Sequence, residues 1–194
     1  DFWYANKLEK VAEIIEGNPE SGLLCHNQAM IRDGRIVTHT DYGPPASFPG
    51  TMYDFMLHIG NGPSTSATVV ARRYLEEIGY FSEDPKLITL EDVDCWLRLC
   101  KVCTFKFIPD VLGVHEFHVA SASANVEQHL SAALTILGKY RDAIEDPGRI
   151  GPRRPLKEYY ATAYYGAARQ YQRRGALKKS LGYYRRTLRT DPLF

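Results

Sequence analysis

The chain has 194 residues, of which 44% are hydrophobic, 12% aromatic and 24% charged. This composition is typical of a packed globular protein and excludes a disordered chain. No apolar run approaches the roughly 20 residues that cross a bilayer, and no signal-peptide pattern is present. Because the chain starts with Asp1-Phe2-Trp3 and not with Met, we expect it to be a fragment of a longer protein.

The net charge of +1 conceals an uneven distribution along the chain. Residues 149–194 carry 12 Lys and Arg against two acidic residues, whereas residues 1–148 carry 12 against 21. Such an asymmetry indicates two regions with different roles. The basic region is expected to contact a protein or an anionic membrane surface, although a solvated helical face has the same composition. Nucleic acid is not expected as a partner, because nothing else in the chain resembles a nucleic-acid module.

The four cysteines are Cys25, Cys95, Cys100 and Cys103. The Cys100-x-x-Cys103 pair has no second pair or nearby His cluster that would complete a zinc site. We therefore expect buried free thiols in a reducing compartment such as the cytoplasm.

Helical and strand-like patterns alternate along the first 145 residues. Apolar spacing predicts a helix over residues 6–16, which Gly17 and Pro19 end. Two strand-like runs at 23–31 and 36–40 flank Asp33-Gly34, a pair typical of hairpin turns. After a loop at 41–50, the pattern predicts a helix over 52–59, a strand over 64–70, a helix over 72–78 and a strand that begins at Thr104.

Residues 89–99 predict a helix with an acidic first turn. One buried stripe at helical spacing is expected from Val93, Trp96, Leu97 and Cys100. Thr89 lies three residues before Asp92, close to a capping-box pattern. Glu91, Asp92 and Asp94 then lie at the positive end of the helix dipole, where carboxylates are stabilised. A structural explanation is also open, because Asp and Glu commonly occur in the first turn of a helix without a catalytic role.

The last third of the chain is expected to be helical. Residues 125–140 form an amphipathic pattern that Asn125 and Gln128 can cap, and residues 146–155, with three prolines and two glycines, are the clearest linker. Residues 156–174 and 176–189 predict an antiparallel helical hairpin. Its small and aromatic positions resemble one tetratricopeptide repeat. Because a single repeat cannot bury its apolar face alone, we expect it to pack on the rest of the chain, on further repeats or on another chain.

Five motifs follow one another between residue 1 and about residue 140. They are Asp1-Phe2-Trp3-x-x-x-Lys7-Leu8-Glu9, Ser64-Thr65-Ser66-Ala67-x-Val69-Val70-x-Arg72, Ile78-Gly79-Tyr80-Phe81, Glu91-Asp92-x-Asp94-x-Trp96-Leu97-Arg98-Leu99, and Val111-Leu112-Gly113 with His118-x-x-Ser121-x-Ser123. In this order and spacing they resemble the carboxyl-terminal part of a family 2 glycosyltransferase with the GT-A fold. The resemblance implies an α/β fold in which residues 1–145 form a GT-A domain without its amino-terminal half. Residues 146–155 would be a linker, and residues 156–194 the tetratricopeptide-like hairpin.

The resemblance implies an inverting transfer of a sugar from a nucleotide diphosphate to an acceptor hydroxyl, in polysaccharide or glycoconjugate synthesis. The enzyme would act in the cytoplasm or at the inner face of the membrane. By its place in the motif, Asp92 would be the general base, a role that contributes about 10²–10⁴-fold to the rate. Glu91 would bind acceptor hydroxyls or orient Asp92. Asp94 is assigned to the acceptor side, where we expect it chiefly to anchor the local structure.

The acceptor side would also include Thr65 and Ser66, although both are ordinary strand formers. For the diphosphate the resemblance implies Mg²⁺ or Mn²⁺, bound by the oxygen ligands of a DxD motif. Asp1 would be the trailing Asp of that motif and contact the donor, with the DxD itself before Asp1. His118 matches a late His of the family, which would reach the diphosphate or the metal, or form a structural hydrogen bond. His115-Glu116 replaces the Tyr-Arg of many relatives and so lacks a phosphate-compatible cation.

Two functions remain open at this point. In the first, the chain is a glycosyltransferase fragment whose partners are a nucleotide-sugar donor and a saccharide or lipid-linked acceptor. In the second, a GT-A remnant and a helical hairpin form a non-catalytic scaffold that docks proteins. The retained Glu91-Asp92 pair favours the enzyme, and the missing donor half predicts that the isolated chain is inactive.

Overall fold

The computed structural model describes residues 1–32, 34–60, 62–116, 125–151 and 154–194. In these residues the chain is a mixed α/β protein with one open five-stranded sheet and eight α-helices, so the predicted α/β class is confirmed. The chain forms two compact units, residues 1–81 with 95–121 and residues 82–94 with 122–194. Among the described residues, no helix has both the length and the apolarity that a bilayer crossing requires.

The sheet belongs to the first unit and is built around one long buried strand. Its strands are β1 (Phe2–Trp3), β2 (Ser21–Arg32), β3 (Arg35–Thr40), β4 (Thr68–Val70) and β5 (Thr104–Glu116). The order is β1-β5-β2-β3, with β4 also paired to β2. β2 and β5 are parallel, and the other pairs are antiparallel. The predicted hairpin is confirmed as β2 and β3.

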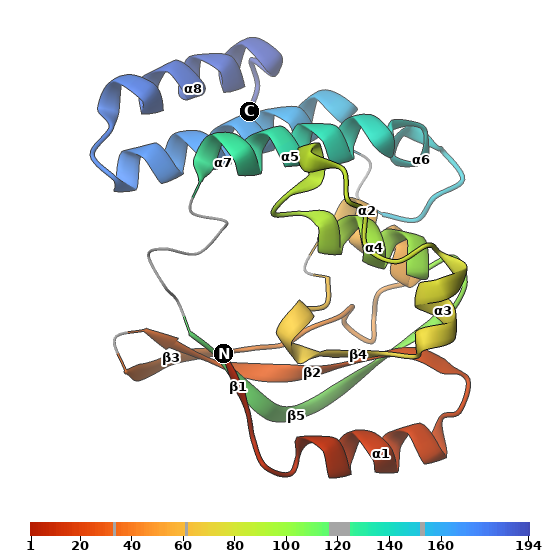
Figure 1. The fold of residues 1–194 in the computed structure, drawn as a ribbon. Coiled ribbons are helices and arrows are strands. Elements are labelled where there is room, and N and C mark those ends of the chain that lie inside the picture. The colour runs from red at the N-terminus through yellow and green to blue at the C-terminus, as the bar shows by residue number, and fades with distance from the viewer. Residues whose placement is uncertain (33, 61, 117–124, 152–153) are drawn as a thin grey trace. The chain divides into compact units, whose positions relative to one another are not determined.

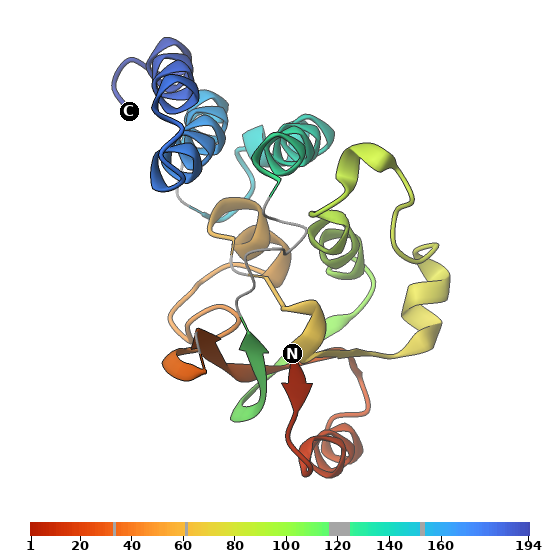
Figure 2. The same ribbon diagram turned by 60° about the vertical axis from the view of Figure 1, so that its left-hand side comes forward.

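Helices lie on both sides of this sheet (Figures 1 and 2). Helix α1 (Lys7–Gly17) packs Val11 against Leu24 of β2 and Ile108 and Leu112 of β5. Helices α2 (Met52–His58) and α3 (Arg72–Glu77) lie on the opposite side. Because helices cover both faces of the sheet, consecutive side chains of β2 are buried, and not only every second one.

The region before β4 differs from the predicted strand over residues 64–70. Only Thr68–Val70 is strand, whereas Thr65–Ala67 forms a 3₁₀ turn, η1. The carbonyl of Ser64 accepts bonds from the Ala67 amide at 3.0 Å and from the Thr68 hydroxyl at 2.7 Å. These local bonds close the turn in place of a sheet ladder.

Helix α4 spans Glu91–Leu99 and so begins two residues after the predicted start at Thr89, whose hydroxyl lies 3.0 Å from His129 Nδ1. Its burial also differs from the prediction. Trp96 and Leu97 are buried as expected, whereas Val93 and Cys100 are only half-buried. The adjacent positions Cys95 and Leu99 are completely buried instead. The prediction of a single stripe was therefore wrong, because the helix is covered on more than one side.

The second unit is helical in its described part. It contains η2 (Pro85–Leu87), the first turn of α4, and helices α5 (Val126–Lys139), α6 (Arg141–Glu145), α7 (Leu156–Arg173) and α8 (Leu177–Thr190). Asn125 caps α5 by accepting a bond from the Gln128 amide at 3.2 Å. The two predicted carboxyl-terminal helices are confirmed, and α7 turns into α8 at Gly175, whose φ is +70°.

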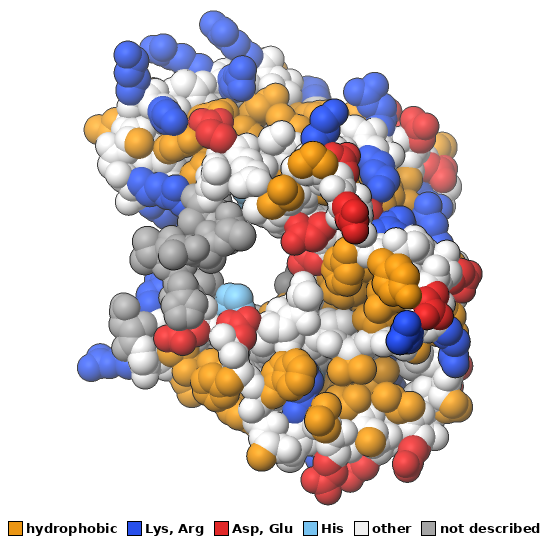
Figure 3. Space-filling model, in the orientation of Figure 1, with side chains coloured by type: hydrophobic (Ala, Val, Ile, Leu, Met, Phe, Trp, Pro, Cys, Tyr) orange, Lys and Arg blue, Asp and Glu red, His pale blue; other side chains and the backbone are white. Residues whose placement is uncertain are grey.

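The core of this unit joins α5 to the hairpin. Val126 and Leu130 of α5 pack against Ala167 and Tyr171 of α7. Between the hairpin helices the Ser180 hydroxyl donates to the Ala168 carbonyl at 2.9 Å. Helix α5 thus covers one side of the hairpin, while Lys and Arg side chains project from α7 and α8 (Figure 3). The domain boundary at residues 146–155 stays a prediction.

Candidate functional site

The carboxylates Glu91 and Asp92 are held at the start of α4. Both are half-buried and lie in the first turn of the helix. Asp92 Oδ1 accepts a bond from the Val93 amide at 2.8 Å. Glu91 Oε2 is shielded from solvent and has no hydrogen-bond partner among the described residues. A buried carboxylate oxygen of this kind is costly and is consistent with a group that binds a ligand hydroxyl.

Asp94 lies on the same turn but is completely buried. Its Oδ1 accepts bonds from the Tyr140 hydroxyl at 2.8 Å and from Lys139 Nζ at 2.5 Å. These contacts tie the first turn of α4 to the end of α5, which is the anchoring role expected for Asp94. A direct contact between Asp94 and an acceptor stays a prediction.

The remainder of α4 is fixed within the first unit. The Trp96 indole donates to the Pro63 carbonyl at 2.9 Å, and only 2% of Trp96 is exposed. Arg98 donates to the carbonyls of Ile78 and Tyr80 at 2.6 Å each. These carbonyls flank Gly79, and both Gly79 and Tyr80 have positive φ. Arg98 therefore holds a strained turn, a role that its place in the motif did not reveal.

His129 is a neighbour of Asp92 that the sequence did not indicate. It lies on α5, with Nδ1 3.0 Å from the Thr89 hydroxyl. Thr89 has φ +84°, which is rare for a β-branched residue. Burial lowers the pKa of His129, and the charge of Asp92 opposes this shift. His129 also lines a cavity of about 220 Å³ between α5 and α7. No periodicity or motif links residues 40 positions apart, so sequence patterns could not find this contact.

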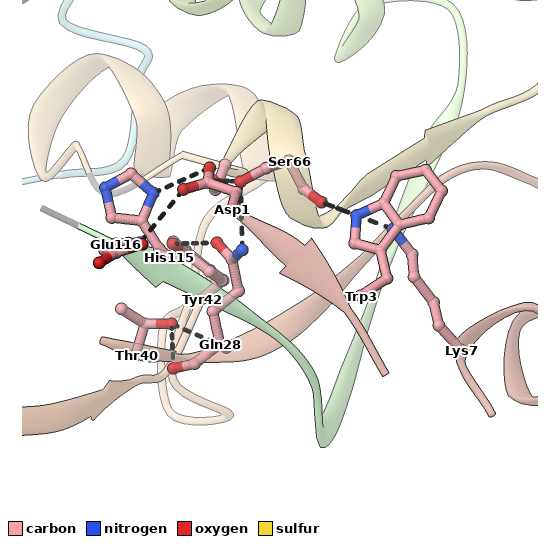
Figure 4. A network of polar contacts seen from close by, with 10 residues as sticks. Asp1, Trp3, Lys7, Gln28, Thr40, Tyr42, Ser66, His115 and Glu116 are labelled. Atoms are coloured by element: carbon pink, nitrogen blue, oxygen red, sulfur yellow. Dashed lines mark hydrogen bonds and ion pairs between the residues drawn. The ribbon is translucent and has the colours of Figure 1, made fainter. Parts of the chain in front are cut away.

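A second polar cluster lies in the first unit, around Asp1 (Figure 4). Asp1 Oδ1 accepts a bond from the Glu116 amide at 3.1 Å, and Oδ2 lies 3.2 Å from His115 Nδ1. This pair of contacts joins the start of the chain to the end of β5. The predicted donor residue Asp1 thus sits beside the His115-Glu116 pair that departs from the family pattern.

Ser66 is the centre of the same network (Figure 4). The Ser66 hydroxyl accepts a hydrogen bond from the side-chain amide of the buried Gln28 at 3.1 Å. The Ser66 carbonyl accepts one from the Trp3 indole N–H at 2.7 Å. Lys7 Nζ lies 3.6 Å from the centre of the Trp3 ring, and burial lowers the pKa of Lys7. Thr65 is exposed beside Ser66.

The predicted site residues are divided between the two units. Asp1 and Ser66 lie in one region of the first unit, whereas Glu91, Asp92 and Asp94 belong to the second unit.

The described residues offer no site for the divalent cation that the resemblance implies. His118, its one predicted protein ligand in this chain, lies outside the described residues. Within the described ranges, His, Cys, Asp and Glu form no group of three that could hold a metal ion. Taken alone, these residues do not fit Mg²⁺ or Mn²⁺.

A scan against protein-family models and a search of curated proteins both return no match.

Proposed function

We propose that this chain is part of a glycosyltransferase, with a domain similar to the GT-A domain of family 2, that transfers a sugar from a nucleotide diphosphate to an acceptor hydroxyl with inversion. The observation that carries the proposal is the carboxylate pair at the start of α4. Glu91 and Asp92 are half-buried, and Glu91 Oε2 lacks a hydrogen-bond partner among the described residues. The motifs read from the sequence supply the reaction class.

In the proposed reaction Asp92 takes the proton of the acceptor hydroxyl as that oxygen attacks the anomeric carbon. The bond from this carbon to the diphosphate breaks on the opposite face, and the nucleoside diphosphate leaves. Glu91 accepts a hydrogen bond from the acceptor and so orients the attacking hydroxyl. A carboxylate is a weak base, but it needs to accept the proton only as the new bond forms.

The contacts of α4 support this assignment of roles. Asp94 is bonded to Lys139 and Tyr140, and Trp96 and Arg98 hold the helix beyond the first turn. A base must be positioned within a fraction of an ångström to act in a transition state. Buried bonds on the same helix meet this requirement better than an exposed loop would.

The test uses the protein at its full natural length. Nucleotide sugars are screened with Mg²⁺ or Mn²⁺ present, and release of nucleoside diphosphate is measured with and without saccharide acceptors. Asp92→Asn should lower the turnover by about 10²–10⁴-fold, because the amide cannot accept the proton. Asp142→Asn, a change of the same chemistry at an exposed position on α6, should leave turnover unchanged.

Two results would count against the proposal. Turnover of Asp92→Asn close to that of the unchanged protein would remove Asp92 from the role of base. A correctly folded protein that releases no nucleoside diphosphate from any sugar donor would favour the non-catalytic scaffold instead.

A further inference from the structure

The outward side of α8 exposes a ridge of leucines. Leu177, Leu181 and Leu188 are 63%, 57% and 53% exposed. Their spacing of four and seven residues places them within about 40° of one another around the helix axis. With Tyr184 they form what we call the α8 ridge. Ser180, by contrast, is buried against α7.

Positive charge lies on both sides of the α8 ridge. The flank on α8 itself consists of the exposed side chains Lys178, Arg185 and Arg189. On the other side, Gln172 of α7 accepts bonds from the Tyr184 hydroxyl at 2.7 Å and from Arg169 at 3.1 Å. The ridge is therefore bordered by three cations of α8 on one side and by the Arg169 guanidinium near Tyr184 on the other.

Acidic residues are scarce in the carboxyl-terminal segment, residues 149–194. Helix α8 contains no Asp or Glu, and residues 149–194 contain only Glu158 and Asp191. Asp191 is buried and accepts a bond from Lys157 at 3.0 Å. The segment thus combines an apolar ridge with a large excess of positive charge.

We infer that the α8 ridge and its flanking cations dock on an anionic lipid bilayer. A helix of this composition lies in the plane of the interface, with leucines among the acyl chains and Lys and Arg at the headgroup phosphates. An anionic bilayer offers an apolar interior and negative charge on both sides of the ridge at once. A second copy packed ridge to ridge would instead place cations opposite cations, which is repulsive.

The test is co-sedimentation of the whole chain with vesicles. Phosphatidylcholine vesicles that contain phosphatidylglycerol should bind the chain at least about tenfold more tightly than pure phosphatidylcholine vesicles, and salt should weaken this binding. The double variant Arg185→Glu/Arg189→Glu should lose binding to the anionic vesicles by about tenfold or more. The triple variant Leu177→Ser/Leu181→Ser/Leu188→Ser should also lose binding, because the leucines no longer insert.

A matched control distinguishes the effect of the α8 ridge and its cations from the effect of net charge. Arg35→Glu/Arg141→Glu changes the net charge by the same amount at exposed positions on β3 and α6, and it should keep most of the binding. Circular dichroism confirms that each variant is folded. Equal binding to both vesicle types, equal loss in the control, or no binding at all would overturn the inference. Leucine-dependent dimerisation without vesicles would overturn it in favour of a second copy of this chain.

Discussion

At the scale of single residues, the chemistry of α4 depends on partners that are distant in the sequence. Asp94 is completely buried, and its carboxylate is bonded to Lys139 and to the hydroxyl of Tyr140. The motif predicted an anchoring Asp at this position. It did not predict what the carboxylate anchors to, because the partners lie 45 and 46 positions away.

Replacing Asp94 by Ala should therefore destabilise the protein. The change leaves the buried Tyr140 hydroxyl without its acceptor, which costs about 1–3 kcal/mol. The measurement is the free energy of unfolding in urea, with Asp142→Ala at an exposed position as the control, where we expect a change within about 0.5 kcal/mol. An Asp94→Ala protein as stable as the control would show that these bonds contribute little.

At the scale of elements, the carboxyl-terminal hairpin was predicted well because its signals are local. The small and aromatic positions of the repeat predicted both helices, and the structure places the turn between them at Gly175. Its φ of +70° lies in the left-handed region, and a Cβ added there would meet no atom within 4 Å. Any penalty for a side chain at this position is therefore conformational and not steric.

Two Gly→Ala variants of the hairpin should change stability in opposite directions. Gly175→Ala should destabilise the protein by about 1–2 kcal/mol, because an L-residue is strained in the left-handed region. Gly182→Ala lies inside α8, where a Cβ also meets no atom, and it should stabilise by about 0.5–1 kcal/mol. The midpoints of thermal unfolding compare the two variants. A shift of the same sign in both would contradict the assigned backbone conformations.

At the scale of the whole molecule, each unit contains a histidine whose side chain is at least half-buried, His26 in the first unit and His129 in the second. His26 of β2 is 1% exposed, and its Nε2 has no partner among the described residues. Burial lowers the pKa of His26 and of His129 below the ordinary value of 6.5. The folded chain therefore resists protonation at both sites, whereas the unfolded chain binds protons below about pH 6.5.

The free energy of unfolding should consequently fall as the pH falls through about 6.5 towards the lower pKa values of the folded state. Urea unfolding at a series of pH values from neutral to acidic measures this dependence. The double variant His26→Gln/His129→Gln should show a weaker pH dependence. His39→Gln on the exposed strand β3 is the control, because it leaves both of these imidazoles in place. A stability that rises over the same interval would contradict the burial of neutral imidazoles.

Local sequence patterns predicted the α/β class, the β2–β3 hairpin, the existence of α4, the carboxyl-terminal hairpin and the division of charge. These features depend on apolar periodicity, turn residues and composition, which neighbouring residues encode. The glycosyltransferase interpretation and the roles of Asp92, Glu91, Thr65, Ser66 and His118 are still predictions. The folded structure alone shows that residues 65–67 form a 3₁₀ turn, that Arg98 holds the turn at Gly79 and that His129 meets the Thr89 hydroxyl. Such contacts join residues far apart in the chain, and which faces meet depends on how the whole core packs.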